Sequence, residues 1–468
     1  MGGIMADTAQ VTEKVGLLRV LGPAHVWALG VGIVLVGEYM GWNFGVGKGG
    51  AYAALIACWF AGILYTCVAM IDSEVTSTVA AAGGQYTQAK HIVGPLMAFN
   101  VGLYLVFAYT MLEAANASTI GYLVDAVANL SGHSGIDQRP FIVLSIMFLA
   151  WLNYRGVLAT LTFNLVITAF AFVAILLLFL LTNPFVSPGL LQHGALMAGQ
   201  AALPYGWLGI LAAMHFGLWY YLGIEGTTQA AEEVRSPARS LPFGTLAGIM
   251  TLVIAATLTW YVCVGLMPWE YLGQAGTPLF DAGRLSGSPI LLWGLGIGTL
   301  FATLASANGC INDASRAWFA MGRDHYLPSW FGAVHPKYRT PYRAIIFLVP
   351  IALLFALKVP IDQIITFSIL SGLLEYTFMP LNVILFRKKW PLESIKRGYE
   401  HPFHPLPAIV LLALCSVTYF AVFLGYGTQL VAMVVFYIIV SLWFHFWRYR
   451  FVRRAAQFTM PWSRPAGY

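Results

Sequence analysis

Charged side chains are scarce in this chain. Only 9% of its 468 residues are Asp, Glu, Lys or Arg, whereas 59% are hydrophobic, and the mean hydropathy is +0.74. A soluble domain carries about 25% charged residues, so this chain has too little polar surface to face water on all sides. Most of its surface must therefore face the lipid bilayer. The net charge of +6 then reflects membrane topology and does not indicate a nucleic-acid partner.

The chain also lacks a disulfide framework and an apolar leader. Its five cysteines all fall within apolar stretches, where a thiol behaves as a small hydrophobic side chain. Residues 1–24 contain no apolar run, so we expect no cleavable signal peptide and a short cytoplasmic N-terminal segment. Ala6 stands where a myristoylation motif requires Ser or Thr, which argues against lipidation.

Long apolar runs predict about twelve membrane spans. A helix needs about 20 predominantly apolar residues to cross the bilayer, and charges, prolines and glycines bound the runs in this sequence. The predicted spans lie near residues 25–47, 51–71, 94–127, 140–154, 160–182, 204–226, 242–267, 289–315, 342–357, 363–386, 406–425 and 429–447.

Lysine and arginine are distributed unevenly between the two sides that these spans define. If the N-terminus is inside, all but four of the 25 Lys and Arg residues fall on the inner side; the four are Lys48, Arg139, Arg284 and Lys358. Cytoplasmic loops of membrane proteins carry such an excess. The sequence therefore predicts a multi-pass protein of the cell (inner) membrane with both termini cytoplasmic, residues 451–468 forming a cytoplasmic tail.

Two of the predicted spans are interrupted by glycine, five spans apart. Gly37 and Gly41 interrupt the first span, and Gly217 and Gly223 interrupt the sixth. Glycine also serves close helix packing, so a single interruption would mean little. Paired interruptions are typical of transporters built from inverted repeats, in which unwound backbone offers N–H and C=O groups to a substrate at mid-membrane.

Glu38 lies between the glycines of the first interruption. Helix N-termini at such breaks attract anions, but a carboxylate at the same place disfavours an anionic ligand and favours a cation. We therefore expect this interruption to receive a cationic substrate.

Four further acids fall inside predicted spans, and one of them, Asp313, has Arg316 three residues on, which favours a helix-end ion pair. An ionisable residue at membrane depth costs about 2.5 to 3.5 kcal/mol on insertion scales, so each requires a partner or a function. Tyr109, Glu113 and Asn116 recur at helical spacing and place a polar stripe toward the bundle interior. Glu225 follows the second interruption, where we expect it to cap freed N–H groups rather than to contact the substrate. Glu375 has no evident basic partner and is either a protonated structural acid or part of a proton pathway.

Six short motifs, in order along nearly the whole chain, resemble the amino acid, polyamine and organocation transporter superfamily. They are Ala28-Leu29-Gly30-Val31-Gly32 leading into the 37–41 break, Glu74 with Gly83-Gly84-Gln85-Tyr86, Leu152-Asn153-Tyr154-Arg155-Gly156, the stretch from Phe216 to Glu225, Glu232-Glu233-Val234-Arg235-Ser236-Pro237, and Met321-Gly322-Arg323-Asp324-His325-Tyr326-Leu327-Pro328. His325 replaces a glycine that is usual in the last motif.

This resemblance implies an all-α integral membrane protein. It implies a single transporter domain over residues 25–450, with two inverted five-helix repeats at about 25–182 and 204–386. Helices 1 and 6 are then broken, and two peripheral helices follow at about 406–447.

Within the superfamily, the segment from Gly22 to Gly30 followed by Gly37-Glu38-Tyr39-Met40-Gly41-Trp42-Asn43 is most similar to bacterial ethanolamine permeases. Amino acid carriers tend to have a small residue between the glycines of the break, where main-chain N–H groups hold the substrate carboxylate. The resemblance thus implies a secondary transporter that imports ethanolamine or a similar small amine cation by alternating access. An amino acid or polyamine transporter or exchanger of the same superfamily is the alternative.

Trp219 corresponds to an aromatic residue of the sixth helix that stacks on basic substrates in the superfamily. An indole face beside a carboxylate favours a cation, although packing in an aromatic-rich bundle would also account for Trp219. The expected substrate-binding residues are Gly37, Glu38, Met40, Gly41, Tyr109, Phe216, Trp219, Tyr220 and Tyr221.

The mechanism of coupling is left open by the sequence. Some proton-coupled relatives carry a lysine in the fifth helix, and residues 160–182 contain none. Symport of a proton through Glu38, Glu113 or Glu375, facilitated diffusion and exchange are the alternatives, and Glu225 is a further candidate for a coupling or structural acid. No metal-ligand cluster or catalytic nucleophile stands at membrane depth, so we expect no enzyme activity, cofactor or metal. The sequence does not predict an oligomeric state.

Overall fold

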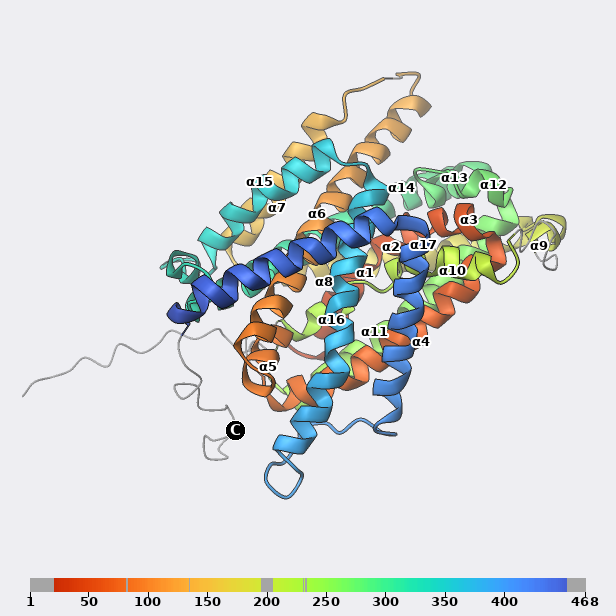
Figure 1. Ribbon diagram of the computed structural model, residues 1–468. Coiled ribbons are helices and arrows are strands. Elements are labelled where there is room, and N and C mark those ends of the chain that lie inside the picture. Colours follow the sequence, from red (N-terminus) through yellow and green to blue (C-terminus); the bar gives the residue numbers. More distant parts are fainter. Residues whose placement is uncertain are drawn as a thin grey trace, which may run out of the picture.

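The computed structural model describes residues 21–80, 83–133, 135–194, 205–229, 231 and 234–452. Helices build the described chain, and a single isolated bridge joins Leu21 to Val234 (Figure 1). Most of the predicted N-terminal segment and cytoplasmic tail, together with Glu232 and Glu233 of one motif, lie outside the described residues. The main helices are α1 (Pro23–Val34), α2 (Val36–Tyr39), α3 (Asn43–Gly49), α4 (Ala51–Thr78), α5 (Gly84–Ile92), α6 (Pro95–Leu130), α7 (Arg139–Arg155), α8 (Val157–Thr182), α9 (Pro188–Gly194), α10 (Leu208–Trp219), η2 (Ile224–Thr228), α11 (Pro237–Leu266), α12 (Trp269–Leu272), α13 (Pro278–Leu285), α14 (Pro289–Arg323), α15 (Tyr342–Lys358), α16 (Ile361–Lys389) and α17 (Leu406–Trp443).

Membrane-spanning helices dominate this architecture. By length and composition, seven helices of the described chain can cross a membrane, or eight if the bent pair at the N-terminus forms one span. A backbone in hydrocarbon must satisfy its own N–H and C=O groups, which a helix does within a single segment. The expectation of an all-α integral membrane protein is confirmed.

The packing of the helices repeats itself between the two halves of the chain. Helix α1 packs on α11 and α10 packs on α4, while α8 packs on α14 and α16 packs on α6. In each of these two pairs, a contact between one helix of the first five-span group and one of the second is matched by the contact between their equivalents. Five is an odd number of crossings, so two such groups enter the membrane in opposite directions, as in inverted repeats.

The two predicted peripheral spans form one bent helix. Hydrogen bonds continue through α17, but Tyr426 has non-helical angles (φ −139°, ψ 41°) and divides it into two legs. Figure 1 shows the legs diverging from this bend, one beside α4 and the other crossing in front of α6. We call residues 427–443 the distal leg.

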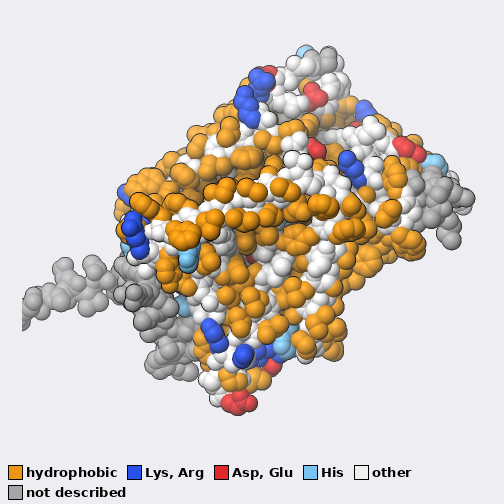
Figure 2. Space-filling model, viewed as in Figure 1, with side chains coloured by type: hydrophobic (Ala, Val, Ile, Leu, Met, Phe, Trp, Pro, Cys, Tyr) orange, Lys and Arg blue, Asp and Glu red, His pale blue; other side chains and the backbone are white. Residues whose placement is uncertain are grey.

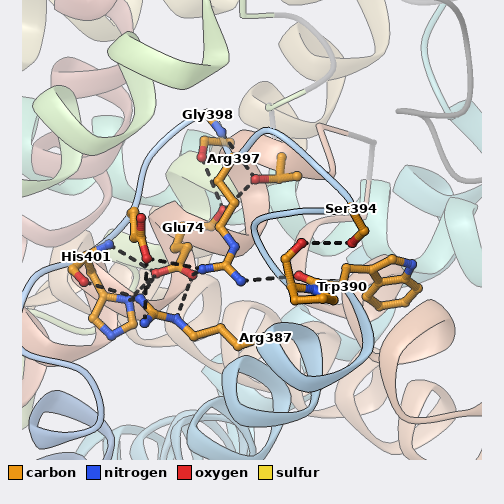
Figure 3. Close-up of polar contacts among 11 residues, drawn as sticks. Glu74, Arg387, Trp390, Ser394, Arg397, Gly398 and His401 are labelled. Carbon is orange, nitrogen blue, oxygen red and sulfur yellow. Dashed lines mark hydrogen bonds and ion pairs between the residues drawn. The ribbon is translucent and has the colours of Figure 1, made fainter.

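A buried ion cluster fixes the loop between α16 and α17 to the end of α4 (Figure 3). The Glu74 carboxylate is fully buried. Arg387 donates to both of its oxygens, at 2.9 and 2.6 Å, and the backbone N–H of His401 donates to Oε2 at 3.0 Å. Arg397 adds an ion pair at 3.3 Å. These contacts join segments more than 300 residues apart in the sequence.

We predict that Glu74→Gln strongly destabilises the protein. Removing the shared carboxylate leaves Arg387 and Arg397 without their main acceptor, and breaking a buried ion pair from one side costs about 3 to 5 kcal/mol. Glu400→Gln is the matched control, because Glu400 pairs with the same two arginines but its side chain is 45% exposed; exposed pairs contribute about 0 to 1 kcal/mol. Thermal unfolding in detergent compares the two variants, and equal losses would contradict an anchoring role for Glu74.

Candidate functional site

The first span is broken at Met40 and Gly41. Helix α2 ends at Tyr39, Met40 is fully extended (φ −162°, ψ 164°) and Gly41 has a φ of +92°, a conformation in which a Cβ atom would be strained. The axis bends by 47° between the helices on either side. The interruption is shorter than the sequence suggested, because Glu38 lies in the last helical turn before the break and not in unwound backbone.

The sixth span is broken between Tyr220 and Gly223. Helix α10 ends at Trp219, a turn follows, and Gly223 adopts a φ of +106° before the short helix η2 begins. The predicted pair of broken helices is therefore present, and each break contains a glycine with positive φ.

The two breaks touch each other. A Cβ atom on Gly37 would lie 2.6 Å from the carbonyl oxygen of Trp219, and one on Gly41 would lie 2.5 Å from its indole nitrogen. The indole N–H donates to the carbonyl oxygen of Met40 at 3.0 Å. The carbonyl that unwinding would otherwise leave unpaired in the first span is thus satisfied by a side chain of the sixth.

Side chains of this chain also occupy N–H groups at both breaks. The N–H of Gly41 donates to Asn43 Oδ1 at 3.1 Å, and the N–H of Gly223 donates to Glu225 Oε2 at 3.2 Å. Glu225 therefore caps freed backbone, as expected. Asn43 was not among the expected site residues, although an Asn two residues after a turn glycine is a recognisable capping signal.

Glu38 stands out because nothing in the described structure pairs with it. The side chain is fully buried, and neither carboxylate oxygen has a hydrogen-bond partner among the described residues. Cys58, Tyr220 and Tyr221 are neighbouring polar side chains, and none of them donates a hydrogen bond to this carboxylate. A buried charge without a partner is costly, so this position requires a proton or a bound cation.

A cavity of about 670 Å³ is lined by Met40 of the first break and by residues of the helix α3 that follows it. Met40, Phe44 and Phe216 contribute apolar lining, and Lys48 and Asp362 contribute charges. Lys48 lies in the last turn of α3, and Asp362 lies in the first turn of α16. Arg387 of the ion cluster lies in the last turn of α16. The cavity and the cluster around Glu74 are therefore at opposite ends of this helix. Tyr426, at the bend of α17, also lines it.

Met40 and Phe216 are the expected substrate-binding residues that line this cavity. The remaining expected residues are buried around the breaks: Gly37, Glu38, Gly41, Tyr109, Trp219, Tyr220 and Tyr221. Trp219 is 3% exposed, and its ring covers Gly41 instead of an open space. The cavity therefore ends at the Trp219 contact in this conformation, which encloses Glu38.

The other buried acids lie on the far side of the second break. The hydroxyl of Tyr109 approaches Glu225 Oε1 at 3.5 Å. Glu375 is fully buried, with no hydrogen-bond partner for either oxygen among the described residues, and interacts electrostatically with Glu225 and Asp72. Glu113 is also buried. No group of three or more His, Cys, Asp or Glu in the described part of the chain could hold a metal ion.

A polar network missed by the sequence analysis surrounds Asp72. Its carboxylate accepts from Gln85 at 2.7 Å and from Gln88 at 2.8 Å. Gln85 also donates to Thr228 Oγ1 at 2.8 Å, so the network joins α4 and α5 to the segment that follows the second break. Asp72 lies near the end of a long apolar helix, where its neighbours in sequence give no sign of these partners.

Comparison with known proteins agrees with this architecture. The family model for amino acid permeases matches residues 24–458. An uncharacterized transporter of Rhizobium meliloti (strain 1021) is 75% identical over 467 residues, covering 99% of this chain and all of that protein.

More distant relatives have names that give a substrate. A methylthioribose transporter of Bacillus subtilis (strain 168) is 25% identical, covering 87% of this chain and 89% of that protein. A branched-chain amino acid permease of the same organism is 24% identical, covering 90% and 91%. With a family model that spans nearly the whole chain and the two broken helices in place, the protein is a multi-pass membrane transporter that belongs to the amino acid permease family.

Proposed function

We propose that this transporter imports ethanolamine or a similar small amine cation by alternating access. The observation that carries the proposal is Glu38, a fully buried carboxylate without a hydrogen-bond partner among the described residues, in the last turn before the first break. An ammonium group bound beside Glu38 would supply both the charge and the hydrogen-bond donors that the carboxylate lacks.

The occupied N–H groups at the breaks support an amine over an amino acid. A substrate carboxylate needs free donors, but Gly41 donates to Asn43 and Gly223 donates to Glu225. An amino acid that bound these two N–H groups would have to displace their capping side chains, and it would also bring its carboxylate close to that of Glu38. Ethanolamine has no carboxylate and avoids both costs.

Aromatic rings beside Glu38 provide a second source of affinity. Tyr220 and Tyr221 are near its carboxylate, and the Trp219 indole lies against Gly41. Each ring face that meets an ammonium group contributes about 0.5 to 2 kcal/mol. Because the two breaks are in contact, a short amine would need the least separation of the breaks to bind between them, while a polyamine or an amino acid is the competing substrate class.

Access to Glu38 requires the two breaks to separate. The cavity at the Lys48 end reaches Met40, whose carbonyl is bound by Trp219. We infer that release of this hydrogen bond opens the site toward that end, and that rocking of the repeats then opens it toward the Glu74 end. In the orientation that the Lys and Arg distribution predicts, the Lys48 end is extracellular and both termini are cytoplasmic.

Glu38→Gln should weaken uptake of ethanolamine by about tenfold or more, because removing one charge from a desolvated pair leaves the other uncompensated. Glu270→Gln is the control, since Glu270 lines the cavity but its side chain is 51% exposed. The measurement is the concentration dependence of labelled ethanolamine uptake into liposomes, with alanine and putrescine as competitors. Unchanged affinity for ethanolamine in the Glu38 variant would show that this carboxylate does not bind the substrate. If alanine competed more strongly than unlabelled ethanolamine, the amino acid alternative would be favoured.

Trp219→Ala should raise the dissociation constant for ethanolamine by about twofold to thirtyfold, the range that a cation–π contact spans. Trp219→Phe should lose less, because an aromatic face remains. Binding by calorimetry in detergent compares the variants. Both lose the hydrogen bond to Met40, so equal losses would assign the effect to that bond and not to stacking.

Glu375→Gln should leave uptake driven by membrane potential but change its dependence on pH. Entry of a monovalent cation already gains about 2.3 kcal/mol per 100 mV of inside-negative potential, so net uptake does not require a proton. Glu113→Gln, at another buried acid, is the comparison. Liposome uptake at imposed potentials and pH values measures both, together with counterflow, which needs no gradient. Loss of counterflow in the Glu375 variant would assign that residue to binding or folding instead of coupling.

A further inference from the structure

A second cavity, of about 890 Å³, lies on the outer surface of the helix bundle and is separate from the proposed substrate site. Its walls come from the start of α6, from α16 and from the distal leg of α17. The volume falls within the range of about 300 to 1,000 Å³ that ligand pockets occupy. We call this cavity the α6–α17 groove. Residues that line it include Leu96, Tyr104, Leu374, Val434, Ile438 and His445.

Aromatic contacts with α6 and a hydrogen bond to α16 fix the position of the distal leg beside the groove. Phe444, just beyond the leg, stacks on Phe99 with centroids 4.3 Å apart, and Tyr437 packs edge-on against Tyr104 at 4.6 Å. Tyr437 also shares a hydrogen bond with Ser371 of α16 at 3.1 Å. These contacts fix the distal leg, which forms one wall of the groove.

The surface around the groove is hydrophobic. Leu96, Val434, Ile438 and Leu442 line it and are 42 to 53% exposed. Figure 2 shows this face of the molecule, with hydrophobic side chains along α17 and Lys, Arg and His gathered toward the ends of the helices. A surface of this kind lies in hydrocarbon, where an acyl chain is the available apolar occupant.

One end of the groove is polar and basic. Asn100, Ser441 and His445 line it there, and no acidic side chain is among its described lining residues. Lys389 donates to the carbonyl oxygen of Ile92 at 2.5 Å, beside the lining residues Val93 and Gly94. Arg448 follows His445 by three residues and donates to Leu327 at 2.6 Å. Lys389 and Arg448 are therefore close to lining residues at this end of the groove, in sequence or by contact, and the charged group of each is bound to a backbone carbonyl.

We propose that the α6–α17 groove binds one anionic phospholipid. Its acyl chains lie along Leu374, Val434 and Ile438, and its phosphate lies at the basic end beside His445. Basic pockets between helices at the cytoplasmic side of membrane proteins bind anionic headgroups in this way, and the predicted orientation places this end on that side. A bound lipid would fix the distal leg of α17, whose bend at Tyr426 borders the substrate cavity.

Adjacent residues of the distal leg provide matched variants. Ile438 and Val434 line the groove, whereas Ile439 and Val435 lie outside its lining and have similar exposure. Ile438→Trp and Val434→Trp should fill the groove, and Ile439→Trp and Val435→Trp should place the same indole elsewhere on the lipid-facing surface. All four positions are exposed, and gel filtration of each full-length variant checks its folding.

The test is native mass spectrometry of delipidated protein incubated with phosphatidylglycerol or phosphatidylcholine. We expect the unmodified protein to retain one phosphatidylglycerol, and to retain phosphatidylcholine about fivefold less, as one basic residue near the headgroup would give. Both groove variants should lose the retained lipid and both control variants should keep it. His445→Leu should reduce the preference for phosphatidylglycerol.

Equal retention by groove and control variants would overturn the proposal, as would equal retention of the two lipids by the unmodified protein. A dimer that retains no lipid, and that dissociates only in the groove variants, would assign the groove to a second copy of this chain and would also overturn it. None of these results depends on which substrate is transported.

Discussion

The requirement that backbone polar groups be satisfied within the membrane shapes both broken helices. Unwinding at Met40 and at Gly223 frees N–H and C=O groups that water cannot reach at this depth. Asn43 and Glu225 accept from two freed N–H groups, and the Trp219 indole donates to a freed carbonyl of the other break. Asn43 and Glu225 each act within one break, whereas the hydrogen bond from Trp219 to Met40 also joins the two breaks to each other.

Two buried acids of the described chain, Glu38 and Glu375, have no hydrogen-bond partner for either carboxylate oxygen. Glu74 and Glu38 are both fully buried carboxylates, but Glu74 is held by two arginines and a backbone N–H, whereas Glu38 has no hydrogen-bond partner in the described chain. The first carboxylate fixes a loop to the bundle. The second is a buried carboxylate without a hydrogen-bond partner in the last helical turn before the first break, and for this reason we propose it as the group that binds a cationic substrate.

The bent helix α17 connects two regions that the ten-span bundle alone would keep apart. Its bend at Tyr426 reaches the cavity at the Lys48 end, where the Tyr426 ring stands 4.9 Å from that of His215. Its distal leg then runs to the opposite end of the molecule and forms one wall of the α6–α17 groove. A change in how the distal leg packs against α6 would therefore shift Tyr426, which lines the cavity at the Lys48 end.

The sequence by itself determined the solvent, the helices and the position of the breaks. Hydropathy sets how deep each segment lies, glycines five spans apart mark where the helices are interrupted, and the expected all-helical transporter fold is confirmed by the family match. Glu225 as a backbone cap was also foreseeable, because capping is local. Only the tertiary structure decided that Trp219 donates a hydrogen bond to Met40 and that Arg387 reaches Glu74 across 313 positions. Such contacts depend on which faces of distant helices meet, and a linear pattern of hydrophobicity carries no information about that.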